Sequence, residues 1–352
     1  MKIFIFIICF FIFFSIFSQD TRPIRDDIGY CWQPDQFNRL IKFLKPNERG
    51  QFNHLKLIAG ISPHDDYLYA AQVYYPLFKN INTKEVIIFG VTHSTVRKKI
   101  GNPQNKLIFD DFRFWSGPEH KVQISPLREF LKKKMTGKYF LTSNLAHLLE
   151  HSIEATIPFL QHFNPGIKIT PIMVTGMPFE EMEKISDEIS QFISIYIRQN
   201  HLHLGRDIFF LISSDANHYG QDFNNTCFGQ DARAHQLATA QDIKIARTYL
   251  SGHISKAKIK GLTRSLWGKT YQDYNNTLWC GKYSLPFGMM TILKVVENIH
   301  RKGILRGKIF CYSDTYSNGV LPIKKTGCGI TAPFSLKHWV GYFSAGFFLN
   351  KN

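Results

Sequence analysis

Alternation between short apolar runs and helical patterns most constrains the fold of this 352-residue chain. The apolar runs are residues 55–61, 85–90, 168–175 and 207–213, and helical patterns that follow them include residues 67–78, 179–199 and 232–249. Strands that alternate with helices usually pair in parallel through right-handed crossovers. The sequence therefore predicts an α/β fold with a mainly parallel, doubly wound sheet flanked by helices.

Other segments extend this pattern. The predicted helices are residues 37–44, 286–300 and one that opens at Ser125-Pro126, and the predicted strands are residues 308–312 and 340–342. Residues 95–124 are rich in aromatic and turn residues, which indicates a hairpin or a covering loop. We expect residues 149–159 to be helical until Pro158, because proline does not continue a helix.

The first 18 residues differ from the rest of the chain. Residues 3–17 are apolar apart from Ser15, a length typical of a signal peptide and short for a membrane span. We predict a signal peptide over residues 1–18, with an uncleaved membrane anchor as the alternative. Cleavage would direct the chain to the exterior or to the endomembrane lumen. Residues 19–352 show no internal repeat and no long linker, so we expect one α/β domain.

Cysteines and sequons bear on this compartment. The cysteines after the leader are Cys31, Cys227, Cys280, Cys311 and Cys328. Their odd number leaves at least one outside an intramolecular disulfide, and no CxxC motif indicates a zinc ribbon or a thioredoxin site. The sequons that begin at Asn224 and Asn275 predict a glycoprotein if the chain enters the secretory route.

The formal net charge is +16. The lysines are scattered, and no nucleic-acid-binding motif accompanies them. We therefore predict a solvated basic surface and no nucleic-acid partner.

Ionisable side chains follow three of the predicted strands. His64 follows the first, His93 the second, and Asp215 and His218 the fourth. In a doubly wound sheet these strand ends lie along one edge, where ligands bind. Two imidazoles and a carboxylate favour a transition-metal site, and Cys280 could add a thiolate.

Each of these residues also has an ordinary structural interpretation. A single histidine after a strand is more often a loop residue than a ligand. Asp66 could cap the helix that begins at Tyr67, and His151 and Glu154 could lie on a solvated helix face. Cys280 could be an inert buried thiol or a disulfide partner.

Five motifs in a fixed order carry a family resemblance. They are Ser62-Pro63-His64 with Tyr67 and Tyr69, Phe89-Gly90-Val91-Thr92-His93-Ser94, Glu150-His151-Ser152-Ile153-Glu154, Ser213-Ser214-Asp215-Ala216-Asn217-His218-Tyr219-Gly220, and Cys280-Gly281. Together they resemble the Memo family, also called AmmeMemoRadiSam system protein B, over residues 22–342. The family is similar in fold to the class III extradiol (LigB-type) dioxygenases.

The resemblance implies a metal site of His64, His93 and Cys280, with Asp215 and His218 nearby and the Glu154 segment behind. It also implies mononuclear iron or copper, and either redox activity or a phosphopeptide-binding signalling role. Its members are expected in the cytoplasm, which conflicts with the leader.

The residue types agree with this implied chemistry. Two imidazoles and a thiolate suit iron, copper or zinc better than Mg²⁺. Asp215 or Glu154 could orient a ligand imidazole, and His218 or His151 could move protons, so these four are the candidate catalytic residues.

One position departs from the family pattern. Members usually carry Ala-Gly where this chain has Asp65-Asp66. We expect backbone strain if the site needs a positive φ, and negative charge beside the metal that could change its metal preference or its function.

Our leading hypothesis is a metal-dependent redox protein, in its most specific form a dioxygenase-like oxidoreductase that uses O₂ or a reduced oxygen species on a small-molecule substrate. The alternatives are a non-catalytic module that binds a peptide or small ligand, and a metal-assisted hydrolase. In a secretory lumen we would expect Cys311 to pair with Cys328 while Cys280 stays with the metal.

Overall fold

The computed structural model describes residues 20–48, 56–300 and 303–350. The predicted leader lies outside these residues. Within them, no helix is both long and apolar enough to cross a membrane.

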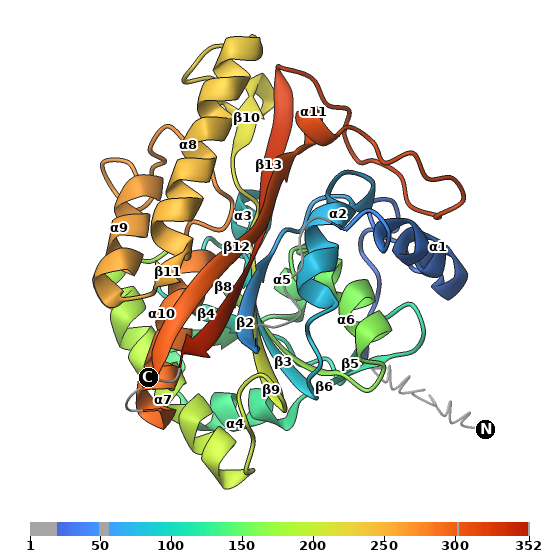
Figure 1. Cartoon of the computed structure of the whole chain (residues 1–352). Coiled ribbons are helices and arrows are strands. Elements are labelled where there is room, and N and C mark those ends of the chain that lie inside the picture. The colour runs from blue at the N-terminus through green and yellow to red at the C-terminus, as the bar shows by residue number, and fades with distance from the viewer. Residues whose placement is uncertain (1–19, 49–55, 301–302, 351–352) are drawn as a thin grey trace, which may run out of the picture.

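A large mixed sheet forms the centre of the fold (Figure 1). Its strand order is β1 (Thr21–Arg22), β5 (Phe114–Trp115), β6 (Val122–Ile124), β8 (Lys168–Val174), β3 (Glu85–Val91), β9 (Ile208–Ser213), β2 (Leu57–Ser62), β13 (His338–Asn350), β12 (Ile304–Asp314) and β11 (Gly252–His253). Strands β4 (Leu107–Phe109), β7 (Phe140–Thr142) and β10 (His218–Gly220) pair at its margins.

The pairing from β6 to β2 is parallel throughout, and β13, β12 and β11 extend it in antiparallel fashion. Strands β2 and β9 are buried along their whole length, because helices cover both faces of the sheet, which explains their continuous apolar sequences. The predicted α/β fold is confirmed, with an antiparallel part at the C-terminal side.

The helices form a layer on each face (Figure 1). One layer contains α1 (Pro34–Leu44), α2 (Tyr67–Phe78) and α6 (Ile157–Phe163), and the other contains α4 (Pro126–Lys134), α7 (Phe179–Gln199), α8 (Ala232–Leu250), α9 (Lys256–Leu266) and α10 (Ser284–Ile299). Each layer packs on the sheet through its own buried apolar cluster. The short helices are α3 (Ser94–Lys99), α5 (Asn144–Leu149) and α11 (Thr315–Asn318).

The prediction of one helix over residues 149–159 was wrong. Helix α5 ends at Leu149, a 3₁₀ turn covers Glu154–Thr156, and α6 begins at Ile157. Pro158 lies in the first turn of α6, where a helix needs no backbone N–H from it. The proline therefore opens a helix instead of ending one. Residues 95–124 contain α3, β4 and the antiparallel pair β5–β6.

Strands β3, β9 and β2 are neighbours in the sheet. They run in parallel, so their carboxyl ends meet at one edge. His93, Asp215 and His64 each lie two residues beyond one of these ends. The sheet order thus brings three of the predicted site residues together.

Candidate metal centre

The His64 imidazole is held in one orientation by the strand beside it. Its Nδ1 lies 2.8 Å from Ser213 Oγ, and Ser213 donates its single hydroxyl hydrogen to the Ser152 carbonyl. Ser213 Oγ must therefore accept from Nδ1–H, which leaves the Nε2 lone pair of His64 free to bind a metal. Burial, reinforced by His93, holds the pKa of His64 well below its ordinary value, so the ring is neutral as a ligand requires.

His93 is oriented in the same way by Glu150. Its Nδ1 lies 2.8 Å from Glu150 Oε1, and its backbone N–H donates to Oε2 of the same carboxylate. Burial alone would raise the pKa of Glu150, but the charge and hydrogen bond of His93 outweigh it and hold that pKa well below its ordinary value. The ionised carboxylate increases the basicity of the imidazole and directs its Nε2 to the site.

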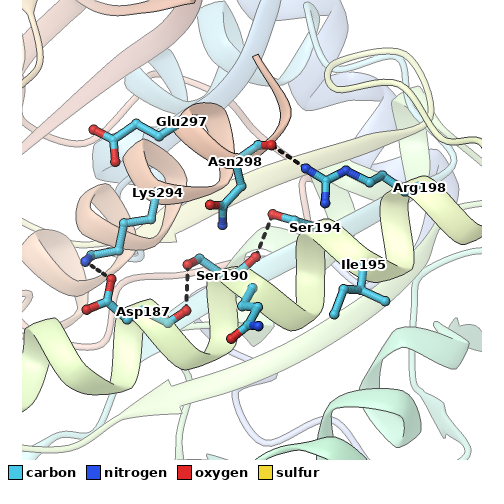
Figure 2. A pocket seen from close by; sticks show the side chains of 9 residues that line it. Asp187, Ser190, Ser194, Ile195, Arg198, Lys294, Glu297 and Asn298 are labelled. Carbon is cyan, nitrogen blue, oxygen red and sulfur yellow. Dashed lines mark hydrogen bonds and ion pairs between the residues drawn. The ribbon is translucent and has the colours of Figure 1, made fainter. Parts of the chain in front are cut away.

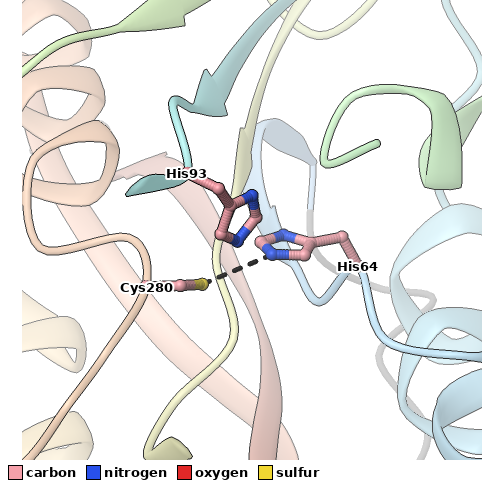
Figure 3. A group of neighbouring side chains, drawn as sticks. All are labelled: His64, His93 and Cys280. Atoms are coloured by element: carbon pink, nitrogen blue, oxygen red, sulfur yellow. Dashed lines mark hydrogen bonds between the residues drawn. The ribbon is translucent and has the colours of Figure 1, made fainter. Parts of the chain in front are cut away.

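Cys280 reaches the site from the loop before α10 (Figure 3). Its Sγ lies 3.4 Å from His64 Nε2 and accepts from the Asp215 N–H at 3.2 Å. The preceding residue, Trp279, is buried and donates through Nε1 to Asp242 on α8 at 2.8 Å. A side chain at Gly281 would collide with Ser214 Oγ. The loop therefore needs both a fixed Trp279 and a glycine at 281 to bring the thiol to the imidazoles.

His64, His93 and Cys280 offer ligand atoms that all lie within 4.8 Å of one another. Burial raises the pKa of the Cys280 thiol well above its ordinary value, and a bound cation is the partner that reverses this shift. Converging N, N and S donors, with both Nδ1 atoms already engaged, fit a soft or borderline transition metal.

The other predicted site residues surround this triad. Asp215 accepts the His64 N–H through Oδ1 and places Oδ2 3.2 Å from His64 Nε2. His218 joins Asp215 and Cys280 in a second group with ligand-atom spacing. His151 stacks on His93, with ring centroids 4.8 Å apart and planes 6° apart. Asp215 and His218 therefore lie among the ligand atoms, and His151 lies against the His93 ring.

Glu154 lies elsewhere. Its carboxylate forms an ion pair with Arg22 at 2.5 Å and accepts the backbone N–H groups of Arg25 and Asp26. The structure gives it neighbours on the N-terminal segment, not a ligand imidazole. Glu150 and Ser213 hold the ligand imidazoles instead. Sequence reasoning missed both roles, although Glu150 stands directly before His151 in the motif.

The expectations for Asp65 and Asp66 were wrong in two respects. Asp66 has φ −49°, and neither residue has the positive φ that would strain it. Asp66 occupies the cap position of α2 but makes no cap hydrogen bond, because its carboxylate accepts from Thr331 N at 2.5 Å. Burial, together with Asp215 and Asp66, raises the pKa of Asp65 well above its ordinary value, and burial raises the pKa of Asp66 to about 6. The negative charge expected beside the metal stays a prediction, and Asp66 would carry it at neutral pH.

The cysteines also differ from expectation. Cys328 Sγ lies 2.7 Å from Cys31 Sγ, while Cys311 Sγ lies 3.5 Å from Ser344 Oγ. The structure thus places the Cys328 thiol beside Cys31 and not beside Cys311, because β12 positions Cys311 against β13.

A family model described as "Memo-like protein" matches residues 29–317, which is most of the chain. The matched range includes His64, His93 and Cys280. The chain belongs to the Memo-like protein family. The predicted membership is confirmed, and the candidate metal centre is a feature of this Memo-like domain.

Curated relatives of this Memo-like chain carry the name MEMO1 family protein. The one from Saccharolobus solfataricus is 31% identical over 211 residues, 58% of this chain and 67% of the relative. The one from Aquifex aeolicus is 27% identical over 195 residues, 54% of this chain and 64% of the relative. The chain thus spans about two thirds of the length of these two relatives, and it spans 52% of a relative from Metallosphaera sedula.

One cavity among the described residues lies away from this centre. It has a volume of about 470 Å³ and is lined from α7 and α10 by Asp187, Ser190, Gln191, Ser194, Ile195, Arg198, Lys294, Glu297 and Asn298 (Figure 2). Three of its charged groups are already engaged, since Lys294 pairs with Asp187 and Arg198 donates to the Asn298 carbonyl. It contains none of the site residues, so we place the functional site at the sheet edge.

The role of Glu150 can be tested by Glu150→Gln. We expect metal affinity to fall about 10- to 100-fold, because the amide keeps the size of the side chain but loses the charge that supports His93. Competition titration with a metal-binding dye measures this change. Glu129→Gln is the control, because Glu129 is an exposed carboxylate on α4. Equal affinity in wild type and Glu150→Gln would contradict the role.

Proposed function

We propose that this chain is a metal-dependent oxidoreductase that binds one iron or copper ion through His64, His93 and Cys280 and reduces O₂ or a related oxygen species. The observation that carries the proposal is the convergence of the three ligand atoms within 4.8 Å, with both imidazole Nδ1 atoms occupied. Either metal, when bound, would supply one-electron chemistry and open coordination positions.

The surrounding side chains supply what such a reaction requires of the protein. His218 and His151 lie beside the ligand atoms, and burial lowers the pKa of each. A neutral imidazole can accept a proton and pass it on. Asp215 accepts the backbone N–H of His64, so it fixes the position of the ligand.

Access to the site comes from the side of His93 and His151. Their side chains are 23% and 30% exposed, while that of His64 is 1% exposed. A substrate would therefore meet the exposed imidazoles first, with His64 behind them. This arrangement is compatible with a small molecule, which we propose as the substrate.

The test uses purified protein loaded anaerobically with Fe²⁺ or with Cu⁺. With ascorbate as donor, transfer of two electrons and two protons to O₂ yields hydrogen peroxide. We expect the rates of O₂ consumption and peroxide formation to be at least about tenfold above those of free metal at the same concentration. We also expect the absorption spectrum of the loaded protein to change when air is admitted. An oxygen electrode, a peroxidase assay and absorption spectra measure these quantities.

Cys280→Ser, loaded to the same metal content, is the matched variant. We expect it to lose the spectral change, because the thiolate is the softest of the three ligands. Bound metal without O₂ consumption, together with binding of peptides or small ligands, would favour a non-catalytic module instead. Hydrolysis products formed under anaerobic conditions would favour a metal-assisted hydrolase.

A further inference from the structure

Two cysteines that the metal centre does not use lie against each other. Cys31 precedes α1 and is buried, and Cys328 lies in the segment between α11 and β13 and is half-buried. Their Sγ atoms are 2.7 Å apart although 297 positions separate them in the sequence. Both are thiols in this structure. The fold therefore brings two distant parts of the chain together at a pair of sulfur atoms.

Residues 319–337, which we call the covering segment, contain no helix and no long strand. Figure 1 shows this segment extending from α11 and β13 toward α1 and α2. Hydrogen bonds attach it there, from Thr331 N–H to the Asp66 carboxylate and from Gly329 N–H to the Ile28 carbonyl. Asp66 is two residues from the ligand His64 in the sequence, so the covering segment is attached to the same strand-to-helix turn that carries this ligand.

We propose that Cys31 and Cys328 form a disulfide that fastens the covering segment to the N-terminal segment beside the metal centre. The oxidant is a small-molecule or protein disulfide, which thiol–disulfide exchange consumes. Two protein thiols and one oxidant disulfide give one protein disulfide and two oxidant thiols. This pair takes the place of the Cys311–Cys328 pair expected from the sequence.

The two thiols have different environments that set the order of exchange. Cys31 donates its hydrogen to Cys328, and this hydrogen bond holds the pKa of Cys328 below its ordinary value while it raises that of Cys31. Cys328 is also the more exposed of the two. The Cys328 thiolate attacks the oxidant first and displaces one oxidant thiolate. Cys31, after losing its proton, then attacks Cys328 Sγ and displaces the second.

The disulfide would act on the site through a neighbour. Tyr30, which precedes Cys31, donates its hydroxyl hydrogen to the His64 carbonyl at 2.7 Å. The crosslink would therefore restrict the motion of the His64 backbone through Tyr30, and it would restrict the motion of the covering segment through Cys328. Formation of the disulfide requires no metal, so this proposal can be tested independently of the proposed redox function.

Peptide mapping tests the proposal directly. The purified chain is equilibrated with an equimolar mixture of reduced and oxidised glutathione, free thiols are alkylated, and the protein is digested with trypsin without reduction. We expect a crosslink between the peptides of residues 26–39 and 326–337, each of which contains one cysteine. A crosslink from 326–337 to the peptide of residues 309–324, which contains Cys311, or the absence of any crosslink would overturn the proposal.

Physical measurements test the fastening. Oxidation should raise the melting temperature by about 5 °C, because the crosslink closes a long loop in the unfolded chain. It should also slow hydrogen exchange at Gly329 and Thr331 on the order of tenfold. Cys328→Ser should lose both effects and the matched variant Cys227→Ser should keep them, since Cys227 is exposed and distant from the pair in sequence. A crosslink without slower exchange would overturn the fastening role, and the wild-type measurements decide this even if Cys328→Ser folds poorly.

Discussion

Replacement of His64 by alanine is expected to abolish stoichiometric metal binding. Wild-type protein should bind about one iron or copper ion per chain, and His64→Ala should weaken that affinity more than about 100-fold, which exceeds the cost of losing a supporting residue alone. His64 is the ligand that contacts the rest of the centre most closely, since its Nε2 faces both Cys280 Sγ and Asp215 Oδ2. Elemental analysis after dialysis, combined with competition titration, measures the loss.

The matched control for this substitution is His253→Ala. His253 is exposed on β11, at the far edge of the sheet from β3, β9 and β2. The His253→Ala variant should keep the metal content of the wild type. Cys280→Ala provides the second test and should lose metal as His64→Ala does. Equal, substoichiometric metal in all four proteins would count against the centre, provided that circular dichroism shows each to be folded.

Replacement of Glu154 by alanine is expected to have its effect on stability. The substitution leaves the Arg22 guanidinium buried without its carboxylate, since the two side chains are 2% and 1% exposed. Breaking a buried ion pair from one side costs about 3–5 kcal/mol. Arg22 also donates to the His147 and Glu150 carbonyls, so loss of order there would reach the segment that carries Glu150. Urea unfolding measures the change in free energy of unfolding.

The outcome distinguishes a structural role of Glu154 from the catalytic role that the sequence suggested. A structural role predicts a destabilised protein that still binds metal once folded. Glu129→Ala is the control: its carboxylate is 60% exposed and pairs with Arg128, so its removal should cost less than about 1 kcal/mol. Normal stability of Glu154→Ala with lost turnover would restore the catalytic interpretation.

The sequence was sufficient to predict the strand ends on which the centre stands. Hydrophobic runs place β2, β3 and β9 nearly to the residue, and the rule that parallel strands end at one edge brings His64, His93 and Asp215 together. The resemblance to the Memo family implied Cys280 as the third ligand. The strand ends depend on local pattern and general topology, which a single sequence contains, whereas the role of Cys280 came from the resemblance.

The supporting contacts could not be predicted in the same way. The hydrogen bonds from His64 to Ser213 and from His93 to Glu150 depend on how side chains from separate elements meet after folding. The sequence indicated that Asp66 could cap a helix. In the structure its carboxylate instead accepts a hydrogen bond from the backbone N–H of Thr331, 265 positions later. The pairing of Cys31 with Cys328 likewise has no signal in the spacing of the cysteines.

Strand β9 lies between the strands that carry the two histidines, and it supplies neither of them. It carries Ser213 at its end and Asp215 just beyond, the residues that hold His64 in place. Side chains alternate between the two faces of a strand, so one extra residue inside β9 would turn every later side chain to the opposite face. The connection between α7 and β9 runs over the surface, where added length is tolerated. Natural length variation in relatives should therefore be found in that connection and be excluded from the six residues of β9.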